Sequence, residues 1–298
     1  MLLAKRSTIL YIYNYKRINS EMIMRKPFIK MHGLGNDFVI LDSRKNNYIL
    51  NEESIKLISN RRLGVGCDQI IEITDSKKAD VYIKIYNSDG SEAEACGNAT
   101  RCVAGLLFAS EPNKEVTIET IAGILKAETE KNGFIKIDMG EPNFFWKDIP
   151  LLKDIKKINF DDCSLKNGFA INIGNPHIVF FVDDLSSIDI DKVGPIIEND
   201  PLFPKKVNVE ICKVINKNKI IVEVWERGAG KTLACGSGAC ASLIAAHKLG
   251  YTKSESEVVL TGGSLHIKWN INTDNRVIMS GPIAVSFLGD LSTLGITI

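Results

Sequence analysis

The chain has 298 residues, about twice the size of a common domain, so two domains or one large domain are expected. Its 37 Lys and Arg residues balance 36 Asp and Glu residues, which argues against nucleic acid as the main partner, and no apolar run has the length of a membrane span. Seven cysteines in a chain of this size are typical of reduced thiols rather than of a disulfide framework. We therefore expect a cytoplasmic globular protein.

The first 23 residues differ in composition from the rest of the chain. They carry four basic residues and one acid, Glu21, but their apolar residues keep no helical period, so the similarity to an organellar presequence is faint. We expect residues 1–23 to be a disordered tail or the product of an upstream start codon. The first strand is predicted to follow Met24.

An internal repeat organises the remaining chain. Residues 95–100, Ala-Cys-Gly-Asn-Ala-Thr, have a counterpart in residues 234–239, Ala-Cys-Gly-Ser-Gly-Ala, which places Cys235 139 residues after Cys96. The same offset relates three further polar landmarks, Gly35-Asn36 to Gly174-Asn175, Gln69 to Asn208 and Asn87 to Glu226, whereas Met139 and Pro142 correspond to Met279 and Pro282 with a slip of one residue. Four landmarks in order at one spacing indicate two copies of a single ancestral domain.

Each copy is predicted to contain one central helix. The segments from Asn98 to Ser110 and from Ser237 to Leu249 are rich in Ala, Leu and Ile, lack proline and have the pattern of helices buried on all sides. The runs 116–120 and 265–269 alternate as strands do and are flanked by glycine turns. The predicted fold class is therefore α+β, with two pseudo-symmetric domains, each an antiparallel strand-rich shell around a central helix.

The same pattern suggests where one domain ends and the other begins. We expect an N-terminal half over residues 24–141 and a C-terminal half over residues 142–283. The last segment, residues 284–298, is expected to return to the first half.

The two Cys-Gly turns carry the chemistry that the sequence suggests. A thiol at the start of a helix lies beside unpaired backbone N–H groups and the positive end of the helix dipole. Both stabilise the thiolate, by about 1 to 2 kcal/mol, and so are expected to lower the thiol pKa by roughly one unit. Cys96 and Cys235, facing each other across the domain interface, could place an acid and a base on opposite sides of one carbon, as stereoinversion requires. The two helix N-termini could also bind a carboxylate between them.

These residues resemble a known family, the diaminopimelate epimerases, over about residues 28–298. Four segments carry the resemblance: Lys30-Met31-His32-Gly33-Leu34-Gly35-Asn36-Asp37-Phe38, Ala95-Cys96-Gly97-Asn98, Gly174-Asn175-Pro176-His177, and Glu226-Arg227-Gly228-Ala229-Gly230 followed by Ala234-Cys235-Gly236-Ser237-Gly238-Ala239-Cys240. The resemblance implies a cofactor-independent isomerase that does not use pyridoxal phosphate. Its substrates would be LL- and meso-diaminopimelate, intermediates of lysine and peptidoglycan precursor synthesis, and its assembly would be a homodimer.

The resemblance also implies a role for each matching residue. Cys96 and Cys235 would be the paired acid and base, and His177 and Glu226 would assist them. The reacting α-carboxylate would be held by backbone groups of Gly97, Asn98, Gly236 and Ser237. The remaining amino and carboxylate groups would be bound by Asn36, Gln69, Asn87, Asn175, Asn208, Glu226 and Arg227. No metal, membrane or nucleic-acid partner is implied.

Two departures from the family pattern stand near these motifs. Cys67 occupies a position where phenylalanine is frequent in the family, and Lys231 follows Gly230 where an acidic residue is common. Because Lys231 is close to Cys235 in the sequence, it could alter the pKa of that thiol. Cys102 and Cys240 are predicted to be core residues, and Cys163 and Cys212 have no predicted role.

Other interpretations compete with this one. Residues 228–232 suggest a phosphate-binding loop, but the motif requires glycine where Trp225 stands. A zinc site is disfavoured because the chain has no C-x2-C or H-x3-H pair and its four histidines are scattered. A proline or hydroxyproline racemase of the same architecture is the nearest enzyme alternative. A non-catalytic redox or binding module with a reversible Cys96–Cys235 disulfide is the alternative from another class.

Overall fold

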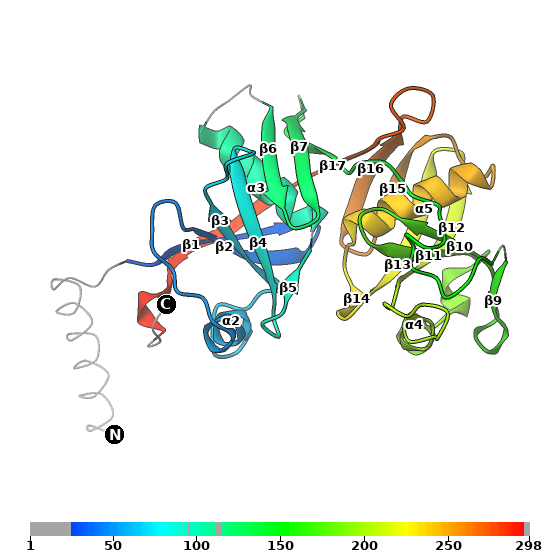
Figure 1. Cartoon of the computed structure of the whole chain (residues 1–298), viewed down its shortest axis with the longest axis horizontal. Helices are drawn as coiled ribbons and strands as arrows, with labels where there is room; N and C mark the ends of the chain where they lie inside the picture. Colours follow the sequence, from blue (N-terminus) through cyan, green and yellow to red (C-terminus); the bar gives the residue numbers. More distant parts are fainter. Residues whose placement is uncertain (1–24, 95, 111–114, 131, 156, 295–298) are drawn as a thin grey trace, which may run out of the picture.

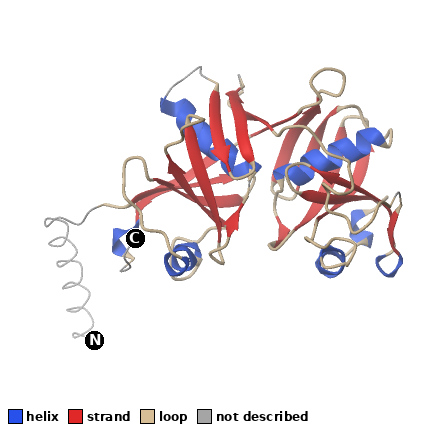
Figure 2. Ribbon diagram, in the orientation of Figure 1, coloured by secondary structure: helices blue, strands red, loops and turns tan. Residues whose placement is uncertain are grey.

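The computed structural model describes residues 25–94, 96–110, 115–130, 132–155 and 157–294. The predicted leader, residues 1–23, lies outside the described residues. The described chain forms two lobes, and each lobe wraps strands around one helix (Figures 1 and 2). None of the helices in this part of the chain has the length and apolar character needed to cross a membrane.

The first lobe is built in chain order from β1 to β8. Its elements are β1 (Pro27–Gly33), β2 (Asn36–Asp42), α2 (Glu52–Ser59), β3 (Gln69–Thr74), β4 (Val81–Asn87), β5 (Glu92–Ala93), α3 (Gly97–Ser110), β6 (Val116–Thr120), β7 (Gly123–Thr129) and β8 (Ile135–Asp138). The last strand, β18 (Ala284–Asp290), pairs with β1 and so lies in the same lobe as the first strand.

The second lobe repeats this order. Its elements are β9 (Ile158–Phe160), β10 (Leu165–Asn172), β11 (Pro176–Phe181), α4 (Ile190–Glu198), β12 (Asn208–Asn216), β13 (Lys219–Glu226), β14 (Gly230–Thr232), α5 (Gly236–Lys248), β15 (Glu255–Leu260), β16 (Gly263–Trp269) and β17 (Val277–Gly281). Helices α3 and α5 occupy equivalent central places, as the buried Ala- and Leu-rich segments predict.

The strand registers reproduce the 139-residue offset. Phe38 pairs with Gln69 between β2 and β3, and His177 pairs with Asn208 between β11 and β12. Further along, Val81 pairs with Ile118, whereas Ile220 pairs with Val258, so the second partner is displaced by 140 residues. The one-residue slip therefore falls after the Cys-Gly turns and before the strands that follow the central helices.

The sheets are mixed rather than antiparallel throughout. Most pairings between described strands are antiparallel, but β2–β3, β4–β6, β11–β12 and β13–β15 are parallel. A parallel pair needs a long crossover, and here a helix lies within each: α2, α3, α4 and α5 respectively. Alternation of side chains revealed the strands but could not show their relative direction.

A strand pair joins the two lobes. β8 of the first lobe runs antiparallel to β17 of the second, with Asp138 opposite Ile278. These two residues are 140 apart, so equivalent strands of the two halves meet at the pseudo-twofold axis. One hydrophobic cluster continues across this junction and includes Ile137 and Met279, while separate smaller clusters pack under α2 and α4.

Candidate active site

Cys96 precedes helix α3 and faces Asn36 of the strand β2. Its thiol lies 3.7 Å from Asn36 Oδ1, to which it can donate, and it accepts the backbone N–H groups of Asn98 and Ala99. The residue is partly exposed. The short Cys-Gly turn thus presents the sulfur at the open first turn of the helix, as expected from the sequence.

Cys235 has the same position in the second half. It is the N-cap of α5, and its sulfur accepts the N–H of Gly238 at 3.3 Å and lies 3.5 Å from Ser237 Oγ. Gly238 is the counterpart of Ala99 at the 139-residue offset, so both thiols are held by the backbone in the same manner. Unlike Cys96, Cys235 is buried.

The two Cys-Gly turns meet at the junction of the lobes. The side-chain amide of Asn98 donates to the carbonyl oxygen of Ala234, the residue before Cys235, at 3.0 Å. Met279 packs against both turns. A Cβ added to Gly236 would lie 2.9 Å from Met279 Sδ, and a Cβ added to Gly97 would lie 2.8 Å from Met279 Cε. The structure therefore brings the two predicted half-sites together.

The ionisation of the thiols differs from the sequence expectation. Burial raises the pKa of Cys96 to about 12, and the charge of Glu226 adds to this effect. Burial likewise raises the pKa of Cys235 well above its usual value, with further contributions from Glu226 and Glu210. The expected lowering by the helix N-terminus is present in the backbone N–H contacts, but removal of the sulfur from water outweighs it.

His177 is fully buried and has two partners. Its Nδ1 lies 2.6 Å from Glu210 Oε1, and its Nε2 lies 2.8 Å from Asn175 Oδ1. Glu210 is also fully buried, and its Oε1 lies only 2.7 Å from the place that a Cβ on Gly238 would take. The carboxylate therefore lies directly against the first turn of α5, beside Cys235.

Glu210 was not predicted from the sequence. It interrupts the apolar run Val209, Ile211 of β12, and a carboxylate in such a run is costly unless it has a partner. That signal is available in the sequence, but it does not identify His177 as the partner. Burial raises the pKa of Glu210, while the contact with His177 opposes this shift.

Glu226 lies at the end of β13, where it reaches Thr232 of β14 and Cys235. Thr232 Oγ1 donates to Glu226 Oε1, and the Cys235 thiol also hydrogen-bonds this carboxylate. Burial raises the pKa of Glu226. Since its charge acts on Cys96 and Cys235 alike, Glu226 lies near both predicted acid and base residues.

Glu198, at the end of α4, holds the turn that follows Glu226. It accepts from Trp225 Nε1 at 2.8 Å and from the backbone N–H of Gly228 at 2.9 Å. Sequence reasoning missed this residue, because nothing in the local pattern of α4 marks a carboxylate that is 5% exposed. The fold thus uses a helix end to fix the Glu226-Arg227 corner.

The predicted amide residues form two groups. In the first half, Asn36 Oδ1 accepts from Asn98, its Nδ2 donates to Asp68, and Gln69 Nε2 donates to Asn87. In the second half, Asn208 donates to the Pro176 carbonyl and accepts the backbone N–H of Arg227 at 2.9 Å, so its side chain ties the two turns together.

Lys231 does not approach Cys235 as its place in the sequence suggested. Its ammonium lies 3.4 Å from Glu223 and 3.9 Å from Asp191. Adjacent residues of a strand face opposite sides, and in β14 it is Thr232 that faces Glu226. The remaining cysteines, Cys67, Cys102, Cys163, Cys212 and Cys240, are all buried.

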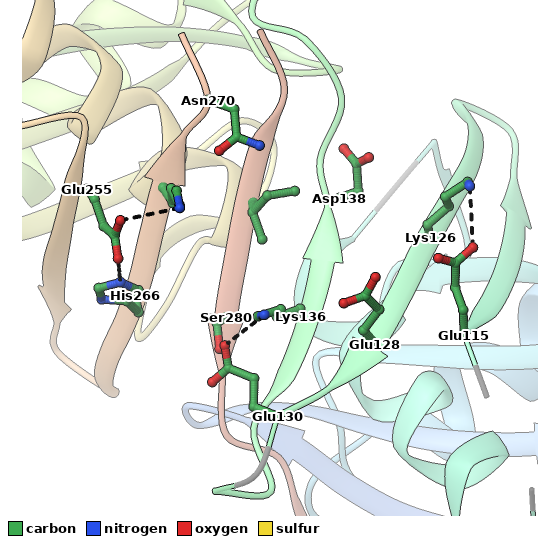
Figure 3. A pocket seen from close by; sticks show the side chains of 12 residues that line it. Glu115, Lys126, Glu128, Glu130, Lys136, Asp138, Glu255, His266, Asn270 and Ser280 are labelled. Atoms are coloured by element: carbon green, nitrogen blue, oxygen red, sulfur yellow. Dashed lines mark hydrogen bonds and ion pairs between the residues drawn. The ribbon is translucent and has the colours of Figure 1, made fainter. Parts of the chain in front are cut away.

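A separate hollow lies on the sheet in which β8 and β17 join the two lobes, and charged side chains line it (Figure 3). Most of its charges pair with one another, among them His266 with Glu255 at 2.8 Å, Lys126 with Glu115 at 3.3 Å, and Lys136 with Glu130 at 3.7 Å. It contains neither predicted catalytic cysteine. This arrangement is typical of a solvated sheet face.

Comparison with known proteins places these features in a family. The model of the family described as diaminopimelate epimerase matches residues 28–145 and 169–285. The chain belongs to the diaminopimelate epimerase family. A diaminopimelate epimerase of Rhodospirillum centenum is 43% identical over 273 residues, which cover 90% of this chain and 93% of that protein. One from Carboxydothermus hydrogenoformans is 45% identical and covers 88% and 98% respectively.

Solved structures show the same fold at low identity. A Bacillus anthracis phenazine biosynthesis protein of the PhzF family superposes with a TM-score of 0.65 at 17% identity, covering 90% of this chain and 99% of its own. A hydroxyproline epimerase from Agrobacterium vitis superposes with a TM-score of 0.64 at 13% identity, covering 90% and 92%. At such identities the likeness establishes the diaminopimelate epimerase-like fold alone.

Proposed function

We propose that this protein is a cofactor-independent epimerase that interconverts LL-2,6-diaminopimelate and meso-2,6-diaminopimelate. The observation that carries the proposal is the meeting of two Cys-Gly helix starts, joined by the Asn98–Ala234 hydrogen bond and by Met279. Membership of the family supports the substrate assignment. The reaction would serve lysine and peptidoglycan precursor synthesis in the cytoplasm.

In the proposed reaction, Cys96 and Cys235 exchange roles with the direction. The thiolate of one cysteine takes the α-proton, and the electron pair of the broken C–H bond stays on the α-carbon and its carboxylate. The thiol of the other cysteine then gives its proton to the opposite face. One thiolate and one thiol are present before and after, so protons and charge balance.

The two helix N-termini provide the electrostatic stabilisation. The backbone groups of Gly97, Asn98, Gly236 and Ser237 begin α3 and α5, where N–H groups lack partners within the helix. We assign them to the α-carboxylate, on which negative charge grows as the α-proton leaves. Donors fixed before the reaction cost no reorganisation when that charge develops.

His177 and Glu226 are proposed to assist the thiols. Glu226 hydrogen-bonds Cys235, and burial raises the pKa of its carboxyl toward that of the thiol, which favours exchange of a proton between them. His177 is fixed by Glu210 and Asn175 on the same side. Both assistants belong to the second half of the chain, so the two thiols are supported unequally.

The amide residues and Arg227 are proposed to recognise the rest of the substrate. Diaminopimelate has a second amino acid head group at its distal end, and an enzyme that tests its configuration needs several directional donors and acceptors. We assign Asn36, Gln69, Asn87, Asn175, Asn208, Glu226 and Arg227 to these groups. Gln69 Oε1 is buried without a hydrogen-bond partner in the described structure and so remains available to a ligand.

The decisive experiment incubates the purified, reduced protein with LL-diaminopimelate in deuterated buffer. We expect the meso isomer with one new α-deuterium, and we expect the Cys235→Ala variant to lose stereoinversion while its circular dichroism stays native. Free proline is run in parallel. If proline exchanges its α-proton with the solvent while diaminopimelate does not react, the substrate assignment changes to that of a proline racemase. If neither compound reacts, the thiol redox module becomes the favoured function.

A homodimer is proposed through the edge strand β18. Val285, Phe287 and Leu288 are exposed on this strand, and its pairing among the described strands is with β1 alone. An edge with exposed apolar side chains is suited to a second copy. Sedimentation of the full chain and of a Leu288→Lys variant tests this assembly, which a monomeric parent protein would contradict.

We propose domain limits that follow the same division, with residues 24–141 and 284–298 in one half and residues 142–283 in the other. The pairing of β18 with β1 supports the return of the C-terminal segment. Limited proteolysis with mass spectrometry tests the limits, since the first cuts in the linkers should fall near residues 142 and 283.

A further inference from the structure

Arg101 is an arginine in the interior of the protein that the proposed mechanism leaves unused. It lies on α3, five residues after Cys96, and is fully buried. Its NH1 atom donates to Met279 Sδ at 3.4 Å, and Met279 is the residue that touches both Cys-Gly turns. The guanidinium therefore lies directly behind the meeting point of the two half-sites.

The chain makes room for this guanidinium at Gly33 and passes beside it at Gly281. A Cβ on Gly33, at the end of β1, would lie 2.9 Å from Arg101 NH2. A Cβ on Gly281, at the end of β17, would lie 3.5 Å from Arg101 Nε. A larger residue at Gly33 would displace the guanidinium from its present position, whereas the distance at Gly281 is an ordinary contact.

Within the described structure this cation has no carboxylate partner. Its Nε and NH2 atoms are buried without a hydrogen-bond acceptor, and the ionisable groups whose charges act on it are the thiols of Cys96, Cys102 and Cys240. A buried cation without a counter-charge is costly. Of the three thiols, Cys96 is the partly exposed one with a proposed reaction to perform.

The repeat makes the electrostatics of the two thiols opposite. At the offset of 139, the counterpart of Arg101 is Cys240, so the second half has no such cation. Conversely, Glu210 corresponds to Ile71 in the first half. The charges that face Cys96 are Arg101 and Glu226, whereas those that face Cys235 are Glu226 and Glu210.

We infer that Arg101 is a positioning residue that assigns the negative charge of the thiol pair to Cys96. The cation attracts the Cys96 thiolate, while two carboxylates repel a thiolate at Cys235. When one of the two thiols is ionised, the negative charge therefore lies on Cys96, and Cys235 stays a thiol. The charge of Glu226 raises the thiol pKa on both sides, so the contrast in sign comes from Arg101 beside Cys96 and Glu210 beside Cys235.

The inference deepens the proposed function and rests on it for its catalytic meaning. With the charge on Cys96, the free enzyme is ready for the stereoisomer whose α-proton faces Cys96. The opposite isomer requires the charge to move to Cys235 before reaction. Kinetics in the two directions should therefore differ in their dependence on pH, which a role of Arg101 in packing alone does not predict.

The test follows thiolate formation by ultraviolet absorbance during a pH titration, without substrate. The parent protein carries Cys235→Ala, so the site contains Cys96 alone, and the full chain is compared with Arg101→Met and Arg101→Lys variants. We expect the Cys96 transition to move up by about one pH unit in Arg101→Met, because an adjacent opposite charge is lost. The Arg101→Lys variant should retain most of the parent value.

The matched control uses Cys96→Ala, which leaves Cys235 in the site. There Arg101→Met should move the Cys235 transition much less than it moves that of Cys96. Equal movement of both thiols, or an unchanged Cys96 transition in a folded Arg101→Met protein, overturns the inference. Since no substrate is present, this result is independent of whether diaminopimelate is turned over.

A second measurement covers the case in which Arg101→Met does not fold. With Arg101 intact, the Cys235→Ala and Cys96→Ala proteins are titrated side by side. Cys96 must ionise at the lower pH of the two. If Cys235 ionises first, the negative charge does not belong to Cys96 and the inference is wrong.

Discussion

The side-chain amide of Asn98 donates a 3.0 Å hydrogen bond to the backbone carbonyl of Ala234, 136 residues further along the chain. Asn98 lies two positions after Cys96, and Ala234 lies one position before Cys235. This contact fixes one half-site relative to the other. It also leaves Asn98 Oδ1 buried without a partner in the described structure, so the amide has capacity for a ligand.

Replacement of Asn98 by alanine should therefore reduce turnover more than stability. The lost bond leaves the buried Ala234 carbonyl without its donor, which costs about 1 to 3 kcal/mol. Misplacement of the thiols should lower kcat by about 100-fold. Urea unfolding and epimerisation rates measure the two effects. Asn199→Ala is the matched control, because that amide also donates to a backbone carbonyl but at an exposed helix end.

The Glu210→Gln variant should impair catalysis with little change in KM. Glutamine keeps the shape and can accept from His177, but it removes the charge that holds the imidazole at 2.6 Å. We expect a fall in kcat of roughly 10- to 100-fold. Steady-state kinetics in both directions measure it, with the part-buried Glu223→Gln of the neighbouring strand as control. A kcat equal to that of the control would show that Glu210 has no part in the reaction.

Alkylation of the site should become faster with rising pH. Burial raises the pKa of both Cys96 and Cys235, so at neutral pH the thiolate is the minor form and its fraction grows about tenfold per pH unit. The rate of iodoacetamide modification at Cys96, followed by mass spectrometry between pH 6 and 9 (~3 units), should show this slope. A rate that is already constant above pH 7 would mean a lowered thiol pKa instead.

Stability should depend on Asp37 at neutral pH and cease to do so in acid. Burial opposes ionisation of Asp37, but hydrogen bonds from Arg61 and Lys30 hold its pKa well below the usual value. A lowered pKa in the folded state contributes stability above the ordinary carboxyl pKa of about 4, and that stability is lost as the pH falls below it. The Asp37→Asn variant should lose about 1 to 3 kcal/mol at pH 7.

Urea denaturation at several pH values checks this prediction. The difference between the parent and Asp37→Asn should shrink steadily below about pH 4, because protonation of Asp37 then removes the same charge. Asp42→Asn is the matched control, since Asp42 pairs with Arg44 two residues away and at the surface. A difference that does not vary with pH would exclude the ion pairs as its cause.

The residues that the sequence revealed are those with a repeated polar context. Cys96 and Cys235 stand out because each begins the same motif, and the strand registers of Gln69 and Asn208 follow the same offset. Polar residues at the ends of strands are recognisable for the same reason. The predicted fold class, two pseudo-symmetric strand-rich halves around central helices, is confirmed.

The residues that were missed are those that break the repeat. Glu210 and Arg101 have Ile71 and Cys240 as counterparts, so comparison of the two halves gives them no support. Each is buried in a mostly apolar element. The partner of Glu210, His177, is 33 residues away in the chain, and two nitrogen atoms of Arg101 have no partner in the described structure. The sign of the thiol pKa shift was also wrong, because the helix N-terminus is a local feature and burial is a property of the whole fold.

The pairing of Asp138 with Ile278 indicates how two separate half-length chains could assemble without a peptide link between them. Because each strand of this pair is the counterpart of the other, the contact is isologous in all but sequence. A chain of half the length would expose β8 as an edge that is complementary to itself. Two such chains, each with one Cys-Gly helix start, could pair along that edge and enclose a site that neither could form alone.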